Sequence, residues 1–135
     1  MKTHTERLPV HTGDREEIIN ITSQVEDVVK KSGVQSGICI IFSMHTTCAI
    51  TINENADPDV KDDLVDGLAR IFPHGGKYRH SEGNSDAHLK TSAVGSSATV
   101  IVDQGRLLLG TWQGIMLCEF DGPRPRTVAV HVQGM

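Results

Sequence analysis

The chain has 135 residues, of which 38% are hydrophobic and 22% are charged, and this composition predicts a single globular domain over residues 1–135. The formal net charge of −4 argues against nucleic acid and against an anionic membrane as partners, although a local basic patch is left open. There is no apolar run of about 18 residues and no apolar signal segment at the N-terminus, so we expect no transmembrane helix and no secretion signal.

The first half of the chain carries clear signals for the ends of its elements. In chain order we expect a strand over 3–10, a helix over 23–32, strands over 37–44 and 46–53, and a helix that begins at Asp57-Pro58 and ends at Pro73. The first helix has valines at helical spacing, and Gly33 is a favoured residue just beyond a helix C-terminus. In the second helix Val60, Leu64 and Leu68 recur every four residues and form an apolar stripe.

The second half is predicted to hold a long polar loop and three more strands. The loop covers residues 73–86, and loops of that length in compact domains are usually functional or mobile. A short helix over 87–94 and strands over 97–103, 113–121 and 126–133 follow the loop. Because strands are often adjacent in the sequence and two main helices are clear, the pattern predicts an α+β fold with a largely antiparallel sheet. A doubly wound βαβ fold fits less well.

His45 and Glu54 flank the predicted strand over 46–53. This strand alternates, so one face is apolar and the other carries hydroxyls, an amide and the imidazole of His45. The extended path from His45 to Glu54 is roughly 27–30 Å, so the two side chains cannot touch within one straight strand. A bend, a neighbouring subunit or two separate subsites remain open. His45 alone could also be a strand histidine held by a hydrogen bond.

The long loop and the residues after it are dense in imidazole, carboxylate and amide groups. They are His80, Glu82, Asn84, Asp86 and His88. Such a density suits Zn²⁺ or a similar divalent ion. The spacing from His80 to His88 matches no specific zinc signature, and a solvated polar loop is the competing interpretation.

A third group is cationic and consists of Lys90, Arg124 and Arg126. Arginine side chains bind phosphate oxygens well, although a turn with solvated arginines would look the same. The segment from Gly110 to Gly114 holds the only tryptophan, and its glycines permit close backbone approach or simply shape a turn. Neither GxxxxGK[ST] nor GxGxxG occurs, so the common nucleotide-binding loops are absent.

The three cysteines are widely spaced and form no CxxC pair. Free thiols in a reducing cytoplasm are the simplest interpretation. Cys48 lies near His45 but alternates with the apolar residues of its strand, which favours a thiol in the core over a nucleophile. We interpret Cys39 and Cys118 in the same way.

Three ordered blocks of the sequence resemble one known family. They run from His45 to Asn55 followed by Asp57-Pro58, from Asn84 to Lys90 followed by Gly95-Ser96-Ser97, and from Leu109 to Ile115 followed by Glu119 to Arg124. They cover most of residues 40–126 in order and resemble the YjbQ family, also called secondary thiamine-phosphate synthase enzymes. The resemblance implies a single YjbQ-like domain with a compact sandwich-like or barrel-like fold. It also implies a homotrimer with histidine-lined clefts between subunits.

The same resemblance implies a weak thiamine-phosphate synthase activity, which joins a pyrimidine methyl diphosphate to a thiazole phosphate and releases diphosphate. The positions carried over from the family are His45, Glu54, Asn84, His88, Lys90, Gln113 and Arg126, and His80 matches a histidine that precedes the second block. Many members carry a further histidine where this chain has Asp86. Aspartate is also a metal ligand, so a metal site would survive with an altered preference.

Combining the residues with the resemblance leads to one hypothesis about the site and two alternatives. The catalytic residues are expected to be His45, Glu54 and His88, the metal ligands His45, His80 and His88, and the substrate-binding residues Thr47, Asn84, Lys90, Gln113, Arg124 and Arg126. The metal would be a divalent ion such as Zn²⁺ or Mg²⁺, and the ligand a small phosphorylated molecule. A non-catalytic trimer that binds a metal or an anion and a hydrolase of a phosphorylated metabolite are the alternatives.

Overall fold

The computed structural model describes all 135 residues and contains two antiparallel sheets and three helices. The larger sheet has the strand order β1 (Lys2–His11), β8 (Pro125–Gly134), β3 (Ser36–Ser43), β5 (Ser97–Asp103), β6 (Arg106–Leu107). The smaller sheet has the order β2 (Glu17–Asn20), β7 (Gln113–Glu119), β4 (Cys48–Glu54). The helices are α1 (Thr22–Ser32), α2 (Pro58–Ile71) and α3 (Ser85–Val94). The predicted α+β class with antiparallel sheets is confirmed.

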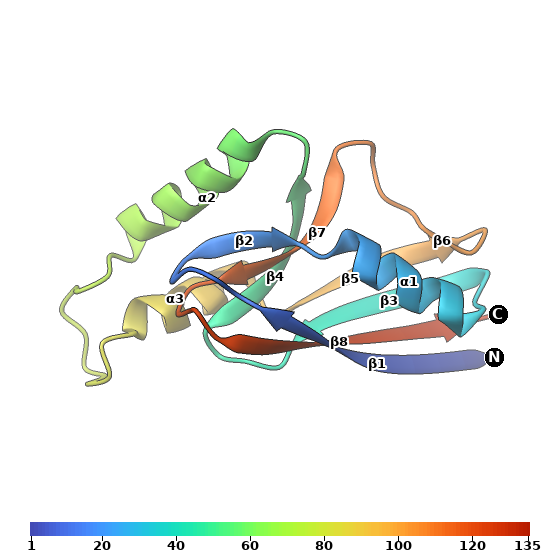
Figure 1. Ribbon diagram of the computed structural model, residues 1–135, viewed down its shortest axis with the longest axis horizontal. Helices are drawn as coiled ribbons and strands as arrows, with labels where there is room; N and C mark the ends of the chain where they lie inside the picture. The colour runs from blue at the N-terminus through green and yellow to red at the C-terminus, as the bar shows by residue number, and fades with distance from the viewer.

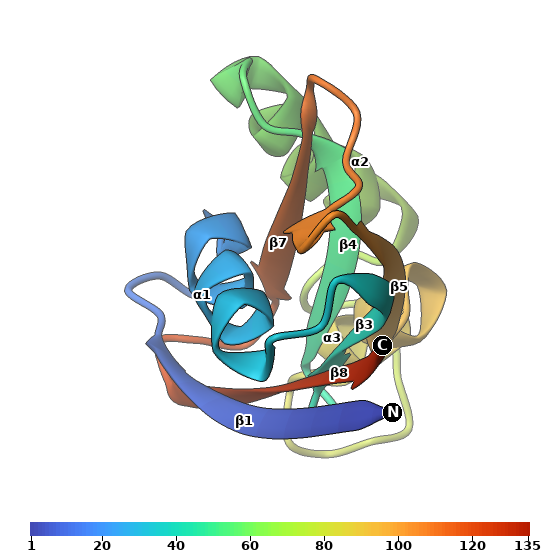
Figure 2. The same ribbon diagram turned by 90° about the vertical axis from the view of Figure 1, so that its right-hand side faces the viewer.

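The two sheets curl into an open half-barrel with α1 on its inner side (Figure 2). β1 pairs with β8 along its whole length, so the two ends of the chain lie side by side (Figure 1). β3 and β8 approach closely at Gly37, where a Cβ atom would lie 2.0 Å from the carbonyl oxygen of Gln133. The barrel-like shape that the resemblance implied is therefore confirmed in this open form.

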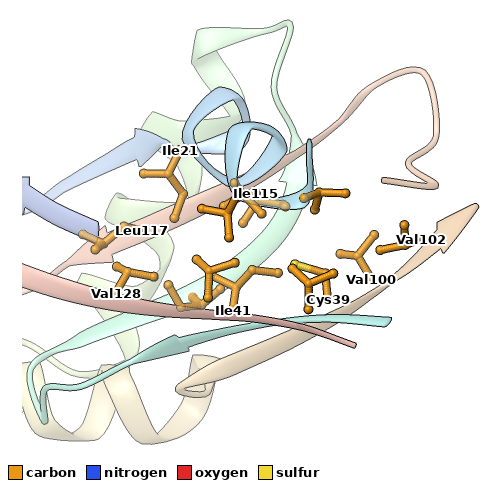
Figure 3. Packing of buried hydrophobic residues seen from close by; sticks show 14 of the residues in the cluster. Ile21, Cys39, Ile41, Val100, Val102, Ile115, Leu117 and Val128 are labelled. Atoms are coloured by element: carbon orange, nitrogen blue, oxygen red, sulfur yellow. The ribbon is translucent and has the colours of Figure 1, made fainter. Parts of the chain in front are cut away.

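The main hydrophobic core fills the inside of the curl (Figure 3). The residues labelled in Figure 3 come from β3, β5, β7, β8 and the residue just before α1. They are Ile21, Cys39, Ile41, Val100, Val102, Ile115, Leu117 and Val128. The valine stripe predicted for the first helix, Val25, Val28 and Val29, is buried in the same cluster. Gly33 ends α1 with a φ of 69°, as its position in the sequence indicates.

β4 is buried on both faces, which differs from the one-sided strand that its alternation predicts. Cys48 and Ile50 belong to the main core, while Ala49 packs in a second cluster with Ala87 of α3 and Phe120. The strand also begins at Cys48, so His45 and Thr47 lie in the turn before it. The face expected to be polar is thus partly covered by α3.

α2 has the predicted boundaries, but it packs only loosely against the rest of the protein. Asp57 caps its N-terminus by accepting a hydrogen bond from the backbone N–H of Asp59 at 2.9 Å, and Pro58 is the first helical residue. None of its residues is fully buried, and Leu64 and Leu68 of the apolar stripe are only half-buried. Figure 1 shows the helix at the margin of the molecule, beside β2.

Three elements go beyond the sequence-based expectation. β2 and the two-residue strand β6 were not predicted, and α3 is a full helix of 10 residues where a short one over 87–94 was expected. No helix combines the length and the apolar character that crossing a membrane requires. All three cysteines are free and buried, which confirms their interpretation as core thiols. Burial raises the pKa of Cys39 and of Cys118 to about 12, so both thiols stay protonated.

Candidate functional site

A polar cleft of about 540 Å³ lies where the turns before β4 and before β8 meet the start of α3. Six of the residues predicted for the site line this cleft: His45, Thr47, Asn84, His88, Arg124 and Arg126. They come from three segments that are distant in the sequence. The structure therefore brings together most of the proposed catalytic and binding residues in a single chain.

His45 is held in one orientation by a backbone group. The N–H of Thr127 donates a hydrogen bond to Nε2 of His45 at 2.8 Å. A neutral imidazole has a single ring lone pair, so this bond uses it and leaves Nδ1 as an N–H donor. Burial lowers the pKa of His45, and the positive charge of Arg126 lowers it further, which favours this neutral form. Nδ1 has no partner within the chain and is a free donor beside the cleft.

Arg126 forms a buried ion pair with Glu119 at the base of the cleft. Arg126 is 4% exposed and Glu119 is fully buried. The Nε of Arg126 donates to Glu119 at 2.8 Å, and its Nη2 donates to the same carboxylate and to Oγ1 of Thr47 at 2.9 Å. Burial raises the pKa of Glu119, but the hydrogen bonds from Arg126, the backbone of Asp121 and Thr12, together with the charge of Arg126, hold the pKa below its ordinary value. Nη1 is the one guanidinium nitrogen of Arg126 without a partner in the chain.

Asn84 and Arg124 meet at Asp121 on the rim of the cleft. Nδ2 of Asn84 donates to the carboxylate of Asp121 at 2.8 Å, and Nη2 of Arg124 lies 3.1 Å from the same oxygen. The Arg124 side chain is 52% exposed, so part of its charge stays available to a ligand. Oδ1 of Asn84 is buried and has no hydrogen-bond partner.

The three histidines proposed as metal ligands do not converge. His80 and His88 lie with their rings perpendicular and 5.4 Å apart, but His80 is in the loop outside the cleft, 3.6 Å from Glu82. No group of three or more His, Cys, Asp or Glu side chains could hold a metal ion. The lone pair of His45 is also already engaged with Thr127. These residues are better suited to donating hydrogen bonds to an anion than to coordinating a metal ion. Metal binding stays a prediction.

Lys90 lies beneath the cleft and belongs to a buried charge cluster. Its Nζ donates to Asp86 at 3.0 Å and to Glu16, and both Lys90 and Asp86 are almost completely buried. Arg15 and His74 add further contacts to Asp86, at 3.1 Å and 3.2 Å. Burial raises the pKa of Asp86, but the hydrogen bonds from Lys90, Arg15 and His74 bring it down to about 2. Lys90 thus anchors α3 and does not line the cleft.

Glu54 and Gln113 lie together at the opposite end of the smaller sheet. They are paired across β4 and β7, and neither lines the cleft. Glu54 accepts a hydrogen bond from the backbone of Ala56 at 2.9 Å, and Gln113 accepts one from Gly110 at 2.7 Å. Within one chain Glu54 does not reach His45, in keeping with the distance along the strand. A contribution of either residue to a neighbouring subunit's site stays a prediction.

Sequence reasoning missed Glu119 and Thr12 as parts of the site. Oγ1 of Thr12 donates to the Glu119 carboxylate at 2.7 Å, which completes the buried network around Arg126. The signal for Glu119 was present, because it is the only charged residue in an otherwise apolar run from Ile115 to Phe120. A charge in a buried strand requires a partner, and Arg126 is the nearest cation in the following strand.

Comparison with known proteins decides the family. The model of the family described as UPF0047 protein YjbQ-like matches residues 6–135. The chain belongs to this family. UPF0047 protein YugU of Bacillus subtilis is 51% identical over 94% of this chain and 97% of its own length. A UPF0047 protein of Methanocaldococcus jannaschii is 49% identical over 93% of this chain and 91% of its own.

Solved structures of other UPF0047 proteins share the fold. A YbjQ-like protein from Sulfolobus solfataricus superposes with a TM-score of 0.96 at 35% identity and covers 99% of both chains. A YjbQ/UPF0047 protein from Clostridium acetobutylicum gives a TM-score of 0.94 at 48% identity over 95% of this chain and 99% of its own. The half-barrel and its cleft-forming turns therefore belong to a fold that this UPF0047 chain shares with its relatives over nearly its whole length.

Proposed function

We propose that the cleft binds the phosphate or diphosphate group of a small metabolite, and that the protein is a weak transferase of the thiamine-phosphate synthase type. The observation that carries the proposal is a pair of donors without partners in the chain, Nδ1–H of His45 and Nη1 of Arg126. Arg124 adds a half-exposed guanidinium on the rim. Charge-assisted donors of this kind are what phosphate oxygens require.

The main requirement of the proposed reaction is stabilisation of the diphosphate leaving group. The C–O bond between the pyrimidine methylene and the diphosphate breaks, and its electron pair leaves with the diphosphate. The lone pair of the thiazole nitrogen then forms the new C–N bond. Donors aimed at the departing oxygens stabilise the growing negative charge, which is the electrostatic contribution that accelerates such steps. His45 and Arg126 would provide it, and His88, which has no partner in the chain, would add a further hydrogen bond.

A non-catalytic anion-binding protein is the second candidate. It is favoured by the position of Glu54, because the carboxylate expected to act as a base lies outside the cleft. The hydrolase alternative has less support, since the His45 lone pair is engaged with Thr127 and cannot activate a water molecule. Both remaining candidates share the same anion site and differ only in turnover.

The experiment that tests the proposal combines an assay with a binding measurement. Wild type should form thiamine phosphate from the two phosphorylated substrates, and His88→Ala should form it much more slowly. Arg70→Gln, which changes an exposed arginine at the end of α2, is the matched control and should behave as wild type. Diphosphate binding without product would favour the second candidate. Absence of diphosphate binding would contradict both.

We also propose that the protein is a cytoplasmic homotrimer. Free buried thiols support a reducing compartment, and apolar surface supports the assembly. Phe42 and Ile101 are 45% and 57% exposed on neighbouring strands of the larger sheet, and the α2 stripe is half-buried. Sedimentation should give three chains per particle, and Ile101→Lys should shift the protein toward monomer. A monomeric wild type would contradict this assignment.

A further inference from the structure

A second hollow of about 310 Å³ adjoins the cleft, and we call it the hydroxyl pocket. It shares His45, Thr46 and His88 with the cleft and continues along α3 to Thr91 and Ser92, and to Ser96 just beyond the helix. Apart from the two histidines, its side chains are hydroxyls, and none is a carboxylate, lysine or arginine. The cleft, in contrast, is lined by charged side chains of both signs, the arginines Arg124 and Arg126 and the carboxylates Glu82 and Asp121. The two histidines thus stand between a charged space and an uncharged, hydrogen-bonding space.

Thr91 provides the observation that points to a ligand in the hydroxyl pocket. It is 6% exposed, and its Oγ1 is buried without a hydrogen-bond partner. A threonine within a helix usually satisfies its hydroxyl on a carbonyl of the preceding turn, and Thr91 does not. Buried polar atoms in native proteins are almost always paired, so this hydroxyl requires a partner from outside the chain.

A second unpaired atom belongs to a residue that lines the adjoining cleft. Oδ1 of Asn84 and Oγ1 of Thr91 are the two buried side-chain polar atoms in the molecule that lack a partner. Asn84 lines the cleft and Thr91 lines the hydroxyl pocket. Because the two hollows share His45, Thr46 and His88, one ligand that occupies both would bring polar groups close to both unpaired atoms.

We infer that the hydroxyl pocket binds the uncharged nitrogen heterocycle of a phosphorylated substrate, while the cleft holds its diphosphate. A ring with amino and ring-nitrogen groups both donates and accepts hydrogen bonds, which matches side chains that can do either. The bond that breaks in the proposed reaction would then lie beside His45 and His88. This inference rests on the proposed function, because it assigns the organic half of the ligand whose anionic half that function places in the cleft.

Thr91→Val tests the pocket with almost no change of shape. Titration calorimetry would compare a pyrimidine methyl diphosphate with inorganic diphosphate. Thr91→Val should weaken binding of the pyrimidine compound by about threefold to tenfold and leave inorganic diphosphate unchanged. Thr91→Ser keeps the hydroxyl and should bind both as wild type does. Thr99→Val, at an exposed position on β5, is the matched control and should alter neither affinity.

The outcomes distinguish failure of the hydroxyl-pocket inference from failure of the proposed anion site. Equal affinity of wild type and Thr91→Val for the pyrimidine compound would overturn the inference, as would an equal loss for both ligands. A wild type that binds inorganic diphosphate as tightly as the pyrimidine compound would mean that the hydroxyl pocket holds only water, and the anion cleft would stand. A wild type that binds neither ligand would overturn the inference and the proposed function together.

Discussion

The backbone N–H of Thr127 donates to Nε2 of His45 across 2.8 Å, and this bond decides which chemistry His45 can perform. It joins the start of β8 to the turn before β4 and fixes the tautomer of the ring. His45 is consequently a hydrogen-bond donor toward the cleft and has no lone pair for a metal ion or a proton. Each consequence of this geometry can be measured.

Replacing His45 should weaken anion binding. His45→Phe removes the Nδ1–H donor, and loss of a hydrogen bond to a charged ligand predicts an affinity for inorganic diphosphate lower by about tenfold or more. His45→Gln can still accept from Thr127 and should retain part of the affinity. His4→Phe makes the same change near the far end of β8 and serves as the control. Unchanged binding by His45→Phe in calorimetry would remove His45 from the anion site.

Chelation should leave diphosphate binding unaffected. No three ligand side chains converge, and His45 has no free lone pair, so the anion is expected to bind protein donors directly. Calorimetry in the presence of EDTA, with elemental analysis of the same sample, provides the measurement. A loss of affinity that added Zn²⁺ restores would support the predicted three-histidine site instead.

The Arg126–Glu119 pair should be costly to break from one side. Glu119→Gln leaves a buried guanidinium without its counter-charge, and such changes lower the free energy of unfolding by about 3–5 kcal/mol. Arg124→Ala breaks the exposed pair with Asp121 and should cost about 1 kcal/mol or less. Urea unfolding of both variants would check the difference. Similar costs for the two would mean that the Arg126 pair adds no more than a surface contact.

Asp86 should make stability depend on pH in the acid range. Its pKa is about 2 in the folded protein against 3.8 for the free side chain, so the unfolded chain takes up the proton first as pH falls. The stabilisation is complete well above pH 3.8 and disappears as pH falls through about 2.

Asp86→Asn provides the comparison for this dependence. At neutral pH it should lower the free energy of unfolding by about 2–3 kcal/mol, because charge-assisted hydrogen bonds to Lys90 and Arg15 are weakened. The gap between wild type and Asp86→Asn should close as pH falls toward about 2, since wild type is then protonated as well. A gap that stays constant from pH 7 to that range would contradict the assignment of the shift to Asp86.

Local signals in the sequence predicted those elements that have their own end markers. Asp57-Pro58 and Gly33 mark helix ends by backbone chemistry that acts within a few residues, and both were interpreted correctly. β2 has only four residues and no alternation that could be recognised, so pairing with β7 determines it. Strands of this kind depend on contacts that a local pattern does not contain.

Part of the membership of the site was predictable, and the roles of its residues were less so. Clustering of His45, Asn84 and His88 followed from the ordered blocks, and the structure places them in one cleft. The role of Lys90 could not be predicted, because its partner Glu16 lies 74 residues away in the segment before β2. Whether a cation faces a ligand or a buried carboxylate is decided by such long-range packing.

The two helices on either side of the loop over 72–84 differ in how readily they can open. α3 is fixed by the buried charges of Lys90 and Asp86, while α2 has no buried residue. Local opening is cheapest where little apolar surface is lost, so amide hydrogens of α2 should exchange with solvent well before those of α3. The helix that carries His88 and Thr91 therefore keeps its place while α2 opens locally.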